Sequence, residues 1–299
     1  MEKKKKSTID KILTSKGFLI LVLLIGLGIF IYPLISDWYY RMDQEKTVRE
    51  YEDMIDKLPT EEGKKILDQA IAYNQYLAGL SGGIYSEEFI GGIIDLIREG
   101  QIPEFFENGR LIGTVEIPKI DIKLPLRSGT DDDILAHSAG FLINTSLPVG
   151  GESTHSVITA HRGLPSARLF TDLDQLKEGD LFLVQVLDIP HAYEVDQIKI
   201  IEPDQTEDLG IVPGKDYMTL LTCHPYMINS HRLIVRGHRV PYTPEVETKV
   251  EEQKKENRWK LFWKQYKEYI IGIIVLILIV EGVHLRDLKR IRNQKEEKK

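Results

Sequence analysis

The chain contains 299 residues, of which 42% are hydrophobic and 28% charged, and its formal net charge is −7. A chain of this length and composition is expected to fold into one or two globular domains. Its acidic balance argues against a nucleic-acid binder, which would carry a basic patch on its folded part.

The first element is a basic tail followed by an apolar run. Residues 1–17 carry six lysines and two acids, and residues 18–35 (FLILVLLIGLGIFIYPLI) carry no charge. A helix of this length just spans a hydrocarbon core of roughly 30 Å, and Trp38, Tyr39 and Tyr40 follow where an aromatic belt would lie. A cleaved signal peptide is the alternative, but its apolar region would be shorter and would end in small residues. We therefore expect an uncleaved transmembrane anchor.

A second apolar run covers residues 269–285 (YIIGIIVLILIVEGVHL), with Glu281 as its one charge. By length alone it could be a buried helix. Residues 286–299 carry seven basic residues against three acids, and basic residues mark the cytoplasmic side of a membrane span. We expect a second transmembrane helix, both termini inside, and an exterior of residues 36–268 with 26 basic and 40 acidic residues.

The chain after the first apolar run is predicted to be helical. Residues 41–80 form two helices in this interpretation, broken at Leu58-Pro59. The second helix has an apolar stripe with spacings of three and four, formed by Ile66, Ala70, Ile71, Tyr73, Asn74 and Leu77. Paired glycines predict a loop over residues 81–92, and a short helix is expected around Ile93–Glu99.

From Gly113 to Tyr242 the pattern changes to short β-rich runs separated by turn residues. Seven such runs cover residues 114–118, 120–126, 155–160, 180–187, 192–201, 217–223 and 232–240. This spacing indicates an all-β barrel or sandwich. Residues 243–268 are a charged connector, which we expect to be helical.

Cys223 is the only cysteine, and it would lie outside the membrane. Such a thiol is either buried and inert or free and reactive. It ends one predicted strand and Arg232 begins the next, so antiparallel pairing would bring them about 4.8 Å apart. A cysteine enzyme needs a cation or base beside the sulfur and a donor for the oxyanion, and Arg232 fits this need.

Three histidines are candidates for the acid/base partner of Cys223. His224 and His231 each adjoin a site residue, and neighbours on an extended chain point to opposite faces. Both are therefore expected to point away from the site. His161 ends another predicted strand, and only the tertiary fold would bring it to the sulfur.

The motifs TAHRGLPSA (159–167) and TLLTC (219–223), with an arginine nine residues after the cysteine, resemble the sortase family. Together with EIPKIDIKLPL, NTSLPVGG and CHPYMINSHRLIVRG they are similar to the class C, pilin-polymerising sortases of Gram-positive bacteria. A second, C-terminal membrane segment is typical of that class.

The resemblance implies an eight-stranded sortase β-barrel with N-terminal helices and two flanking transmembrane helices. Cys223 would attack the Thr–Gly carbonyl of an LPXTG-like sorting signal to give a thioacyl enzyme. His161 would protonate the leaving amine, Arg232 would hold the substrate backbone and the oxyanion, and a pilin lysine would resolve the intermediate. The family uses no cofactor, and no acidic calcium site is recognised in this sequence.

Two alternatives remain open. A sortase of the same chemistry would anchor proteins to cell-wall peptide or hydrolyse the signal. A non-catalytic membrane scaffold would use the barrel for binding and keep Cys223 inert.

The sequence departs from the class C pattern in two places. No Asp-Pro-aromatic lid motif lies between Leu80 and Gly113; Glu88-Phe89 and Glu104-Phe105 are candidate substitutes, and an ordinary loop is the alternative. His224 stands where the family often has threonine, and we expect a surface or loop role for it.

The expected organisation is a cytoplasmic tail (1–17), an anchor (18–35), a helical or lid region (36–112), a catalytic barrel (113–242), a connector (243–268), a second membrane helix (269–285) and a cytoplasmic tail (286–299). Four other histidines (His137, His155, His191 and His238) are predicted to be structural or exposed. Arg236 and Arg239 alternate with apolar positions and are expected on solvated strand faces.

Overall fold

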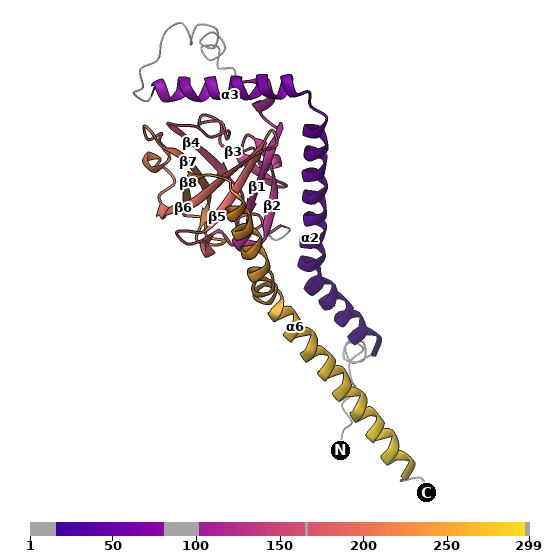
Figure 1. Ribbon diagram of the computed structural model, residues 1–299. Helices are drawn as coiled ribbons and strands as arrows, with labels where there is room; N and C mark the ends of the chain where they lie inside the picture. The colour runs from indigo at the N-terminus through magenta and orange to yellow at the C-terminus, as the bar shows by residue number, and fades with distance from the viewer. Residues whose placement is uncertain (1–15, 81–101, 165–166, 297–299) are drawn as a thin grey trace. The chain divides into compact units, whose positions relative to one another are not determined.

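The computed structural model describes residues 16–80, 102–164 and 167–296. Two N-terminal helices, α2 (Lys16–Asp56) and α3 (Thr60–Leu80), precede a β-barrel, and a long helix, α6 (Pro244–Glu296), follows it (Figure 1). The chain divides into two compact units, residues 1–257 and 258–299, and each is considered by itself. The helix expected around Ile93–Glu99 lies outside the described residues.

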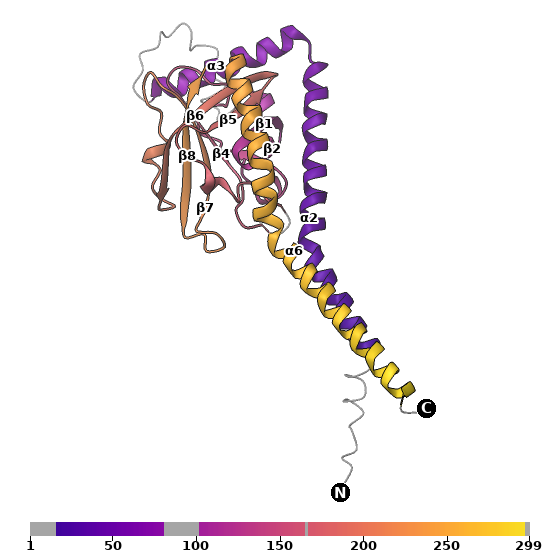
Figure 2. The same cartoon turned by 60° about the horizontal axis from the view of Figure 1, so that its bottom comes forward.

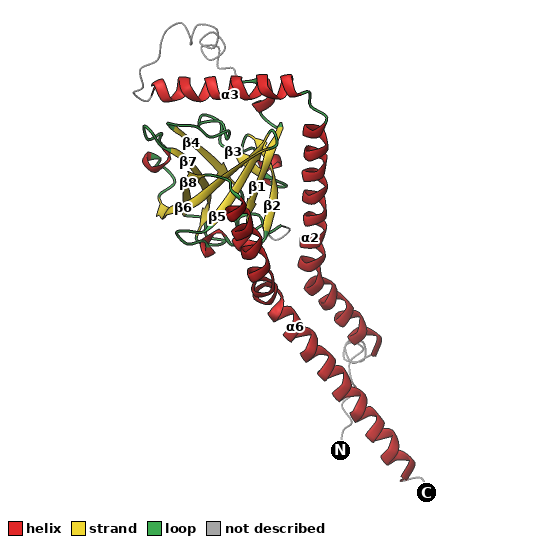
Figure 3. Cartoon of the chain, in the orientation of Figure 1, coloured by secondary structure: helices red, strands yellow, loops and turns green. Residues whose placement is uncertain are grey.

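Eight strands close into a barrel in the order β1-β2-β3-β4-β7-β8-β6-β5 (Figure 3). Only the β2–β3 and β4–β7 pairs are parallel. The strands are β1 (Leu111–Ile117), β2 (Ile122–Ser128), β3 (Ala139–Phe141), β4 (Thr154–Thr159), β5 (Leu181–Val186), β6 (Ile189–Ile201), β7 (Asp216–His224) and β8 (His231–Val240). The expected eight-stranded barrel is confirmed, and the seven predicted runs all lie on strands. The sequence pattern missed β3 because three residues are too short to show alternation.

Along each strand, side chains alternate between the barrel interior and its outer face. One apolar cluster fills the interior. Its members from the strands around Cys223 are Ile158 and Ala160 at the end of β4, Met218 and Leu220 in β7, and Leu233 and Val235 in β8. The residues between these positions therefore face outward, which fixes the face of every side chain near the thiol.

Two buried polar side chains fasten the N-terminal helices to the barrel. The Tyr51 hydroxyl of α2 donates to the Ile112 carbonyl (3.0 Å) and accepts from the Leu187 N–H (2.9 Å). The Asn74 amide of α3 donates to the Leu147 carbonyl (2.9 Å), and its oxygen accepts from the Leu147 N–H (2.6 Å). These bonds satisfy loop and strand-end peptide groups that burial would otherwise leave without partners.

The predicted helix break at Leu58-Pro59 is confirmed, because α2 ends at Asp56 and α3 begins at Thr60. The predicted stripe of α3 is right for Ala70, Tyr73 and Asn74, which are buried. It is wrong for Ile71, whose residue is 37% exposed. One residue step turns a helix by about 100°, so Ile71 lies beside the stripe and not on it.

The residues of the expected connector lie in α6, whose first turns dock on the barrel. Val250 packs with Leu181 and Ala192 in a small second apolar cluster. Lys254 Nζ lies 2.5 Å from Glu116 Oε1 of β1. The first turns of the charged segment, up to Lys254, thus pack on the barrel.

The two expected transmembrane segments are not confirmed. Residues 18–35 lie within α2 and residues 269–285 within α6, and each apolar run continues into a charged part of the same helix. The side chains of residues 18–23 lie outside the described ones. Among the described residues, no helix carries an apolar stretch long enough for a membrane span.

Arg236 and Arg239 were expected on solvated strand faces, and this expectation is wrong for their guanidinium groups. Arg236 Nε donates to Asp196 Oδ1 (2.9 Å), and its guanidinium carbon lies 4.2 Å from the centre of the Tyr217 ring. Arg239 hydrogen-bonds Nδ1 of the buried His191. Burial first, and the Arg239 charge second, lower the pKa of His191 to about 3.

We predict that Asn74→Ala lowers the free energy of unfolding by about 2–4 kcal/mol, because two buried peptide groups of Leu147 lose their partners. Urea denaturation of the full chain measures this change. Ile71→Ala on the same helix is the matched control and is expected to cost less than about 1 kcal/mol. Equal losses would show that apolar contacts alone hold α3.

The buried His191 predicts a loss of stability in acid. Its ordinary pKa of 6.5 applies to the unfolded chain, which therefore takes up this proton first as the pH falls. His191 therefore costs no stability above pH 6.5. Below that pH it lowers the free energy of unfolding by about 1.4 kcal/mol per pH unit, down to about pH 3.

His191→Asn keeps an acceptor for Arg239 but does not titrate. Denaturant titration from pH 7 to 4 measures the unfolding free energy of this variant. Its slope against pH is expected to be smaller than the wild type's by the contribution of about one proton, about 1.4 kcal/mol per pH unit. Parallel curves would contradict a neutral buried His191.

Candidate active site

Cys223 lies near the end of β7, which has β4 on one side and β8 on the other (Figure 2). The antiparallel register of β7 and β8 pairs Cys223 directly with Arg232. The predicted facing of these two residues is therefore confirmed. Cys223 is partly buried, with its thiol free.

His161 follows β4 at the point where this strand runs parallel to β7. The register pairs Thr159 with Leu221, the Ala160 N–H donates to the Leu221 carbonyl (3.3 Å), and the Thr222 hydroxyl donates to the Ala160 carbonyl (2.7 Å). Continuing this register by two steps, past the end of β4, brings His161 level with Cys223, and neighbouring strands lie about 4.8 Å apart.

The alternation of side chains puts these residues on one face. Ala160, Thr222 and Leu233 precede or follow the three site residues, and Ala160 and Leu233 belong to the interior cluster. Cys223 and Arg232 therefore share the outer face of β7 and β8, and the alternation of β4, continued two residues past its end, assigns His161 to the same face. The three residues lie near the end of β4, the end of β7 and the start of β8, which are at the same end of the barrel.

The Arg232 guanidinium is held by the loop before β8. One of its nitrogens, Nη1, donates to the carbonyls of His231 (2.9 Å) and Asn229 (3.2 Å). No carboxylate among the described residues forms an ion pair with it. A guanidinium has five N–H groups in a planar fork, so the remaining donors suit a carbonyl or an oxyanion at the thiol.

The other two histidines have partners away from the thiol, as the alternation predicted. His224 Nδ1 accepts a hydrogen bond from Arg162 Nη1 at 2.9 Å. His231 Nε2 lies 3.3 Å from Glu202 Oε1, and its Nδ1 contacts the Ser230 hydroxyl. The sequence analysis did not single out Arg162, because it was taken only as part of the TAHRGLPSA motif.

The candidate lid pairs have different outcomes. Glu88-Phe89 lies outside the described residues. Glu104 Oε1 accepts from Arg110 (2.8 Å), and the Phe105 ring packs edge-on against Phe106 at 5.1 Å. Both residues of the second pair thus contact neighbours in their own segment. Glu104 forms its ion pair with Arg110 and not with Arg232.

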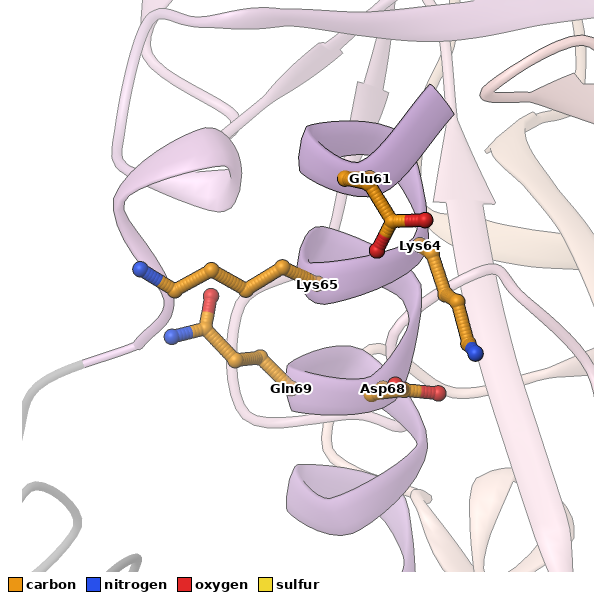
Figure 4. A pocket seen from close by; sticks show the side chains of 5 residues that line it. All are labelled: Glu61, Lys64, Lys65, Asp68 and Gln69. Carbon is orange, nitrogen blue, oxygen red and sulfur yellow. The ribbon is translucent and has the colours of Figure 1, made fainter. Parts of the chain in front are cut away.

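Two hollows elsewhere do not suit the chemistry of a thiol site. A hollow of about 820 Å³ lies between α2, α3 and the segment before β1. Another, of about 440 Å³, is lined among the described residues by five side chains of α3 (Figure 4). Figure 4 shows Lys65 and Gln69 on one side of the helix and Lys64 and Asp68 on the other, so these groups do not converge on a ligand. No group of metal-ligating side chains gathers in the described part of the chain.

Comparison with known proteins decides the family. The sortase domain model matches residues 115–240. The crystal structure of sortase C from Streptococcus pneumoniae is 44% identical, covers 66% of this chain and 98% of its own, and superposes with a TM-score of 0.56. The chain belongs to the sortase family. Its members are cysteine transpeptidases, and this sortase has a single cysteine, Cys223, to serve as the nucleophile that this chemistry requires.

Two further relatives place this sortase within the family. Clostridium perfringens sortase C, solved with the C-terminal cell wall sorting motif, is 41% identical over 66% of this chain and 98% of its own, with a TM-score of 0.57. Sortase D of Bacillus subtilis is 30% identical over 137 residues, 45% of this chain and 66% of that protein. The similar solved structures are thus class C sortases, and the similarity to sortase D is confined to about half of the chain.

Proposed function

We propose that this sortase cleaves an LPXTG-like sorting signal through a thioacyl intermediate and joins the released carbonyl to a lysine amine of a pilin. Cys223 is the nucleophile, His161 the general acid and base, and Arg232 the oxyanion donor. One observation supports the proposal: β4, β7 and β8 are adjacent, and the end of β4, which His161 follows, lies at the same end of the barrel as the Cys223–Arg232 pair.

The reaction uses the three side chains in sequence. The Cys223 thiolate attacks the Thr–Gly carbonyl, a C–S bond forms, and the oxyanion accepts hydrogen bonds from Arg232. His161 protonates the glycine amine as the C–N bond breaks. The incoming lysine amine then attacks the thioester, gives its proton to His161, and the thiolate leaves.

The pilin lysine is proposed as the acceptor because the similar solved structures are class C sortases. The crystal structure of S. pneumoniae sortase C gives insight into the pilin substrate specificity of that protein. Cell-wall peptide or water as acceptor uses the same thioacyl enzyme, so the acceptor is settled only by experiment. A non-catalytic scaffold would leave the convergence of a thiol, an imidazole and a guanidinium without a reason.

We further propose that this sortase is attached to a membrane, with the domain of residues 36–268 outside and both termini inside. Exposed large apolar side chains on the two long helices support this arrangement, since such side chains need cover from water. They include Leu24, Ile25 and Ile29 in α2, and Ile271, Ile274 and Leu278 in α6. The single cysteine offers a direct test, because a membrane-impermeant maleimide added to intact cells would label Cys223 only from outside.

We predict that Cys223→Ala abolishes the thioacyl enzyme and that His161→Ala lowers kcat/KM by about 10³-fold, within the range for general acid–base catalysis. His224→Ala should cost far less than His161→Ala, since its ring lies on the other face. Mass spectrometry of the enzyme with a sorting peptide, with turnover rates, measures these effects. A larger loss for His224→Ala would reassign the base, and an active Cys223→Ala would favour the scaffold.

The acceptor prediction is tested by offering the full chain a pilin and a wall-peptide amine in separate reactions. We expect covalent ladders of pilin on denaturing gels, which disappear with Cys223→Ala. Only wall-linked or hydrolysed product would show that this sortase anchors or trims its substrates instead.

A further inference from the structure

Arg162, directly after His161, has a role that the proposed mechanism does not use. Its side chain is 5% exposed, and its guanidinium contacts two segments, residues 171–174 and the end of β7. Nη2 donates to Asp174 Oδ2 (2.6 Å), Nε donates to the Thr171 carbonyl (3.1 Å), and Nη1 lies 2.9 Å from His224 Nδ1. A buried cation with three partners in place is a rigid element.

The contact with His224 fixes the form of that imidazole. A guanidinium has only donors, so Nδ1 of His224 must accept. This contact therefore assigns the ring N–H to Nε2. His224 therefore acts as a fixed acceptor for Arg162 and not as a second acid or base.

The contact joins the same two chain segments that carry the proposed acid/base and nucleophile. Within the described residues, the hydrogen bonds between β4 and β7 end with those of Ala160 to Leu221 and Thr222. The Arg162–His224 contact lies two residues farther along both segments, on the opposite face from His161 and Cys223. The Arg162–His224 contact thus holds the two segments together just beyond His161 and Cys223.

We propose that Arg162 and His224 are positioning residues that set the separation of the His161 imidazole and the Cys223 sulfur. The inference rests on the proposed roles of His161 and Cys223 and goes beyond them. Asp174 and the Thr171 carbonyl hold the guanidinium, and the guanidinium holds the end of β7 through His224. A small displacement of a reacting group, on the order of 1 Å, costs about 10²-fold in rate, so losing this contact lowers kcat and leaves substrate binding nearly unchanged.

Two substitutions of His224 form a matched pair. His224→Asn places an amide oxygen where Nδ1 lies and keeps an acceptor for Arg162, whereas His224→Leu fills the volume without one. Since His224 is only partly buried, both variants are expected to fold. Arg162→Lys keeps the charge but loses the fork that reaches three partners at once.

The experiment measures kcat and KM with a sorting peptide, the single-turnover rate of thioacyl formation, and the thermal midpoint of each full-length variant. We expect His224→Asn to stay within about threefold of the wild type. His224→Leu and Arg162→Lys should lower kcat and the thioacyl rate by about 10–100-fold, with KM within about threefold. The double variant, His224→Leu with Arg162→Lys, should be no slower than the slower of the two single variants, because both substitutions remove the same contact.

Equal rates for His224→Asn and His224→Leu, or a loss confined to KM, would overturn the inference. If Arg162→Lys does not fold, the His224 pair still decides. Failure of the proposed function is separate, because it would appear as activity in Cys223→Ala or His161→Ala. Inactivity of those two variants, with equal His224 variants, would refute only the positioning role.

Discussion

The parallel pairing of β4 with β7 is the constraint on which the site depends. It connects residues around 160 to residues around 222, while β5 and β6 lie between them in the sequence. Parallel neighbours need such a long connection, and here that connection contains β5 and β6, two further strands of the barrel. The hydrogen bonds of Ala160 with β7 therefore do two things: they close the barrel wall and bring an imidazole to the strand that carries the thiol.

The parts of the site differ in how far the sequence could predict them. The pairing of Cys223 with Arg232 was predictable, because a short loop joins their two strands and leaves antiparallel neighbours as the simple arrangement. The place of His161 was not, since nothing local in the sequence reports a parallel pair separated by two other strands. Its assignment came from the resemblance to sortases, and the register of β4 and β7 supplies the physical reason.

The same distinction explains the errors elsewhere. Seven strands were recognisable from alternation, but β3 was too short to show any. Arg236 was assigned to solvent because its neighbours alternate with it, yet Asp196 and the Tyr217 ring cover it from other strands. Arg162 was passed over because its partners, Asp174 and His224, come from distant segments. Periodicity reports which face a side chain takes, but only the tertiary structure reports what covers that face.

Hydrogen bonds from polar side chains, in addition to buried apolar area, fix the positions of α2 and α3 on the barrel. Tyr51 and Asn74 each bond to peptide groups that lie at strand ends or in loops, and such bonds have strict directions. An apolar contact tolerates sliding, whereas a two-bond clamp on Leu147 does not. Asn74 of α3 thus holds the loop between β3 and β4, and β4 is the strand that His161 follows.

The presence of one sulfhydryl in the whole polypeptide has a practical consequence. A thiol reagent that reacts once per molecule counts competent reaction centres directly, without a correction for background sites. Stoichiometric titration would then give turnover per reduced thiol, even in a preparation where part of the protein is oxidised.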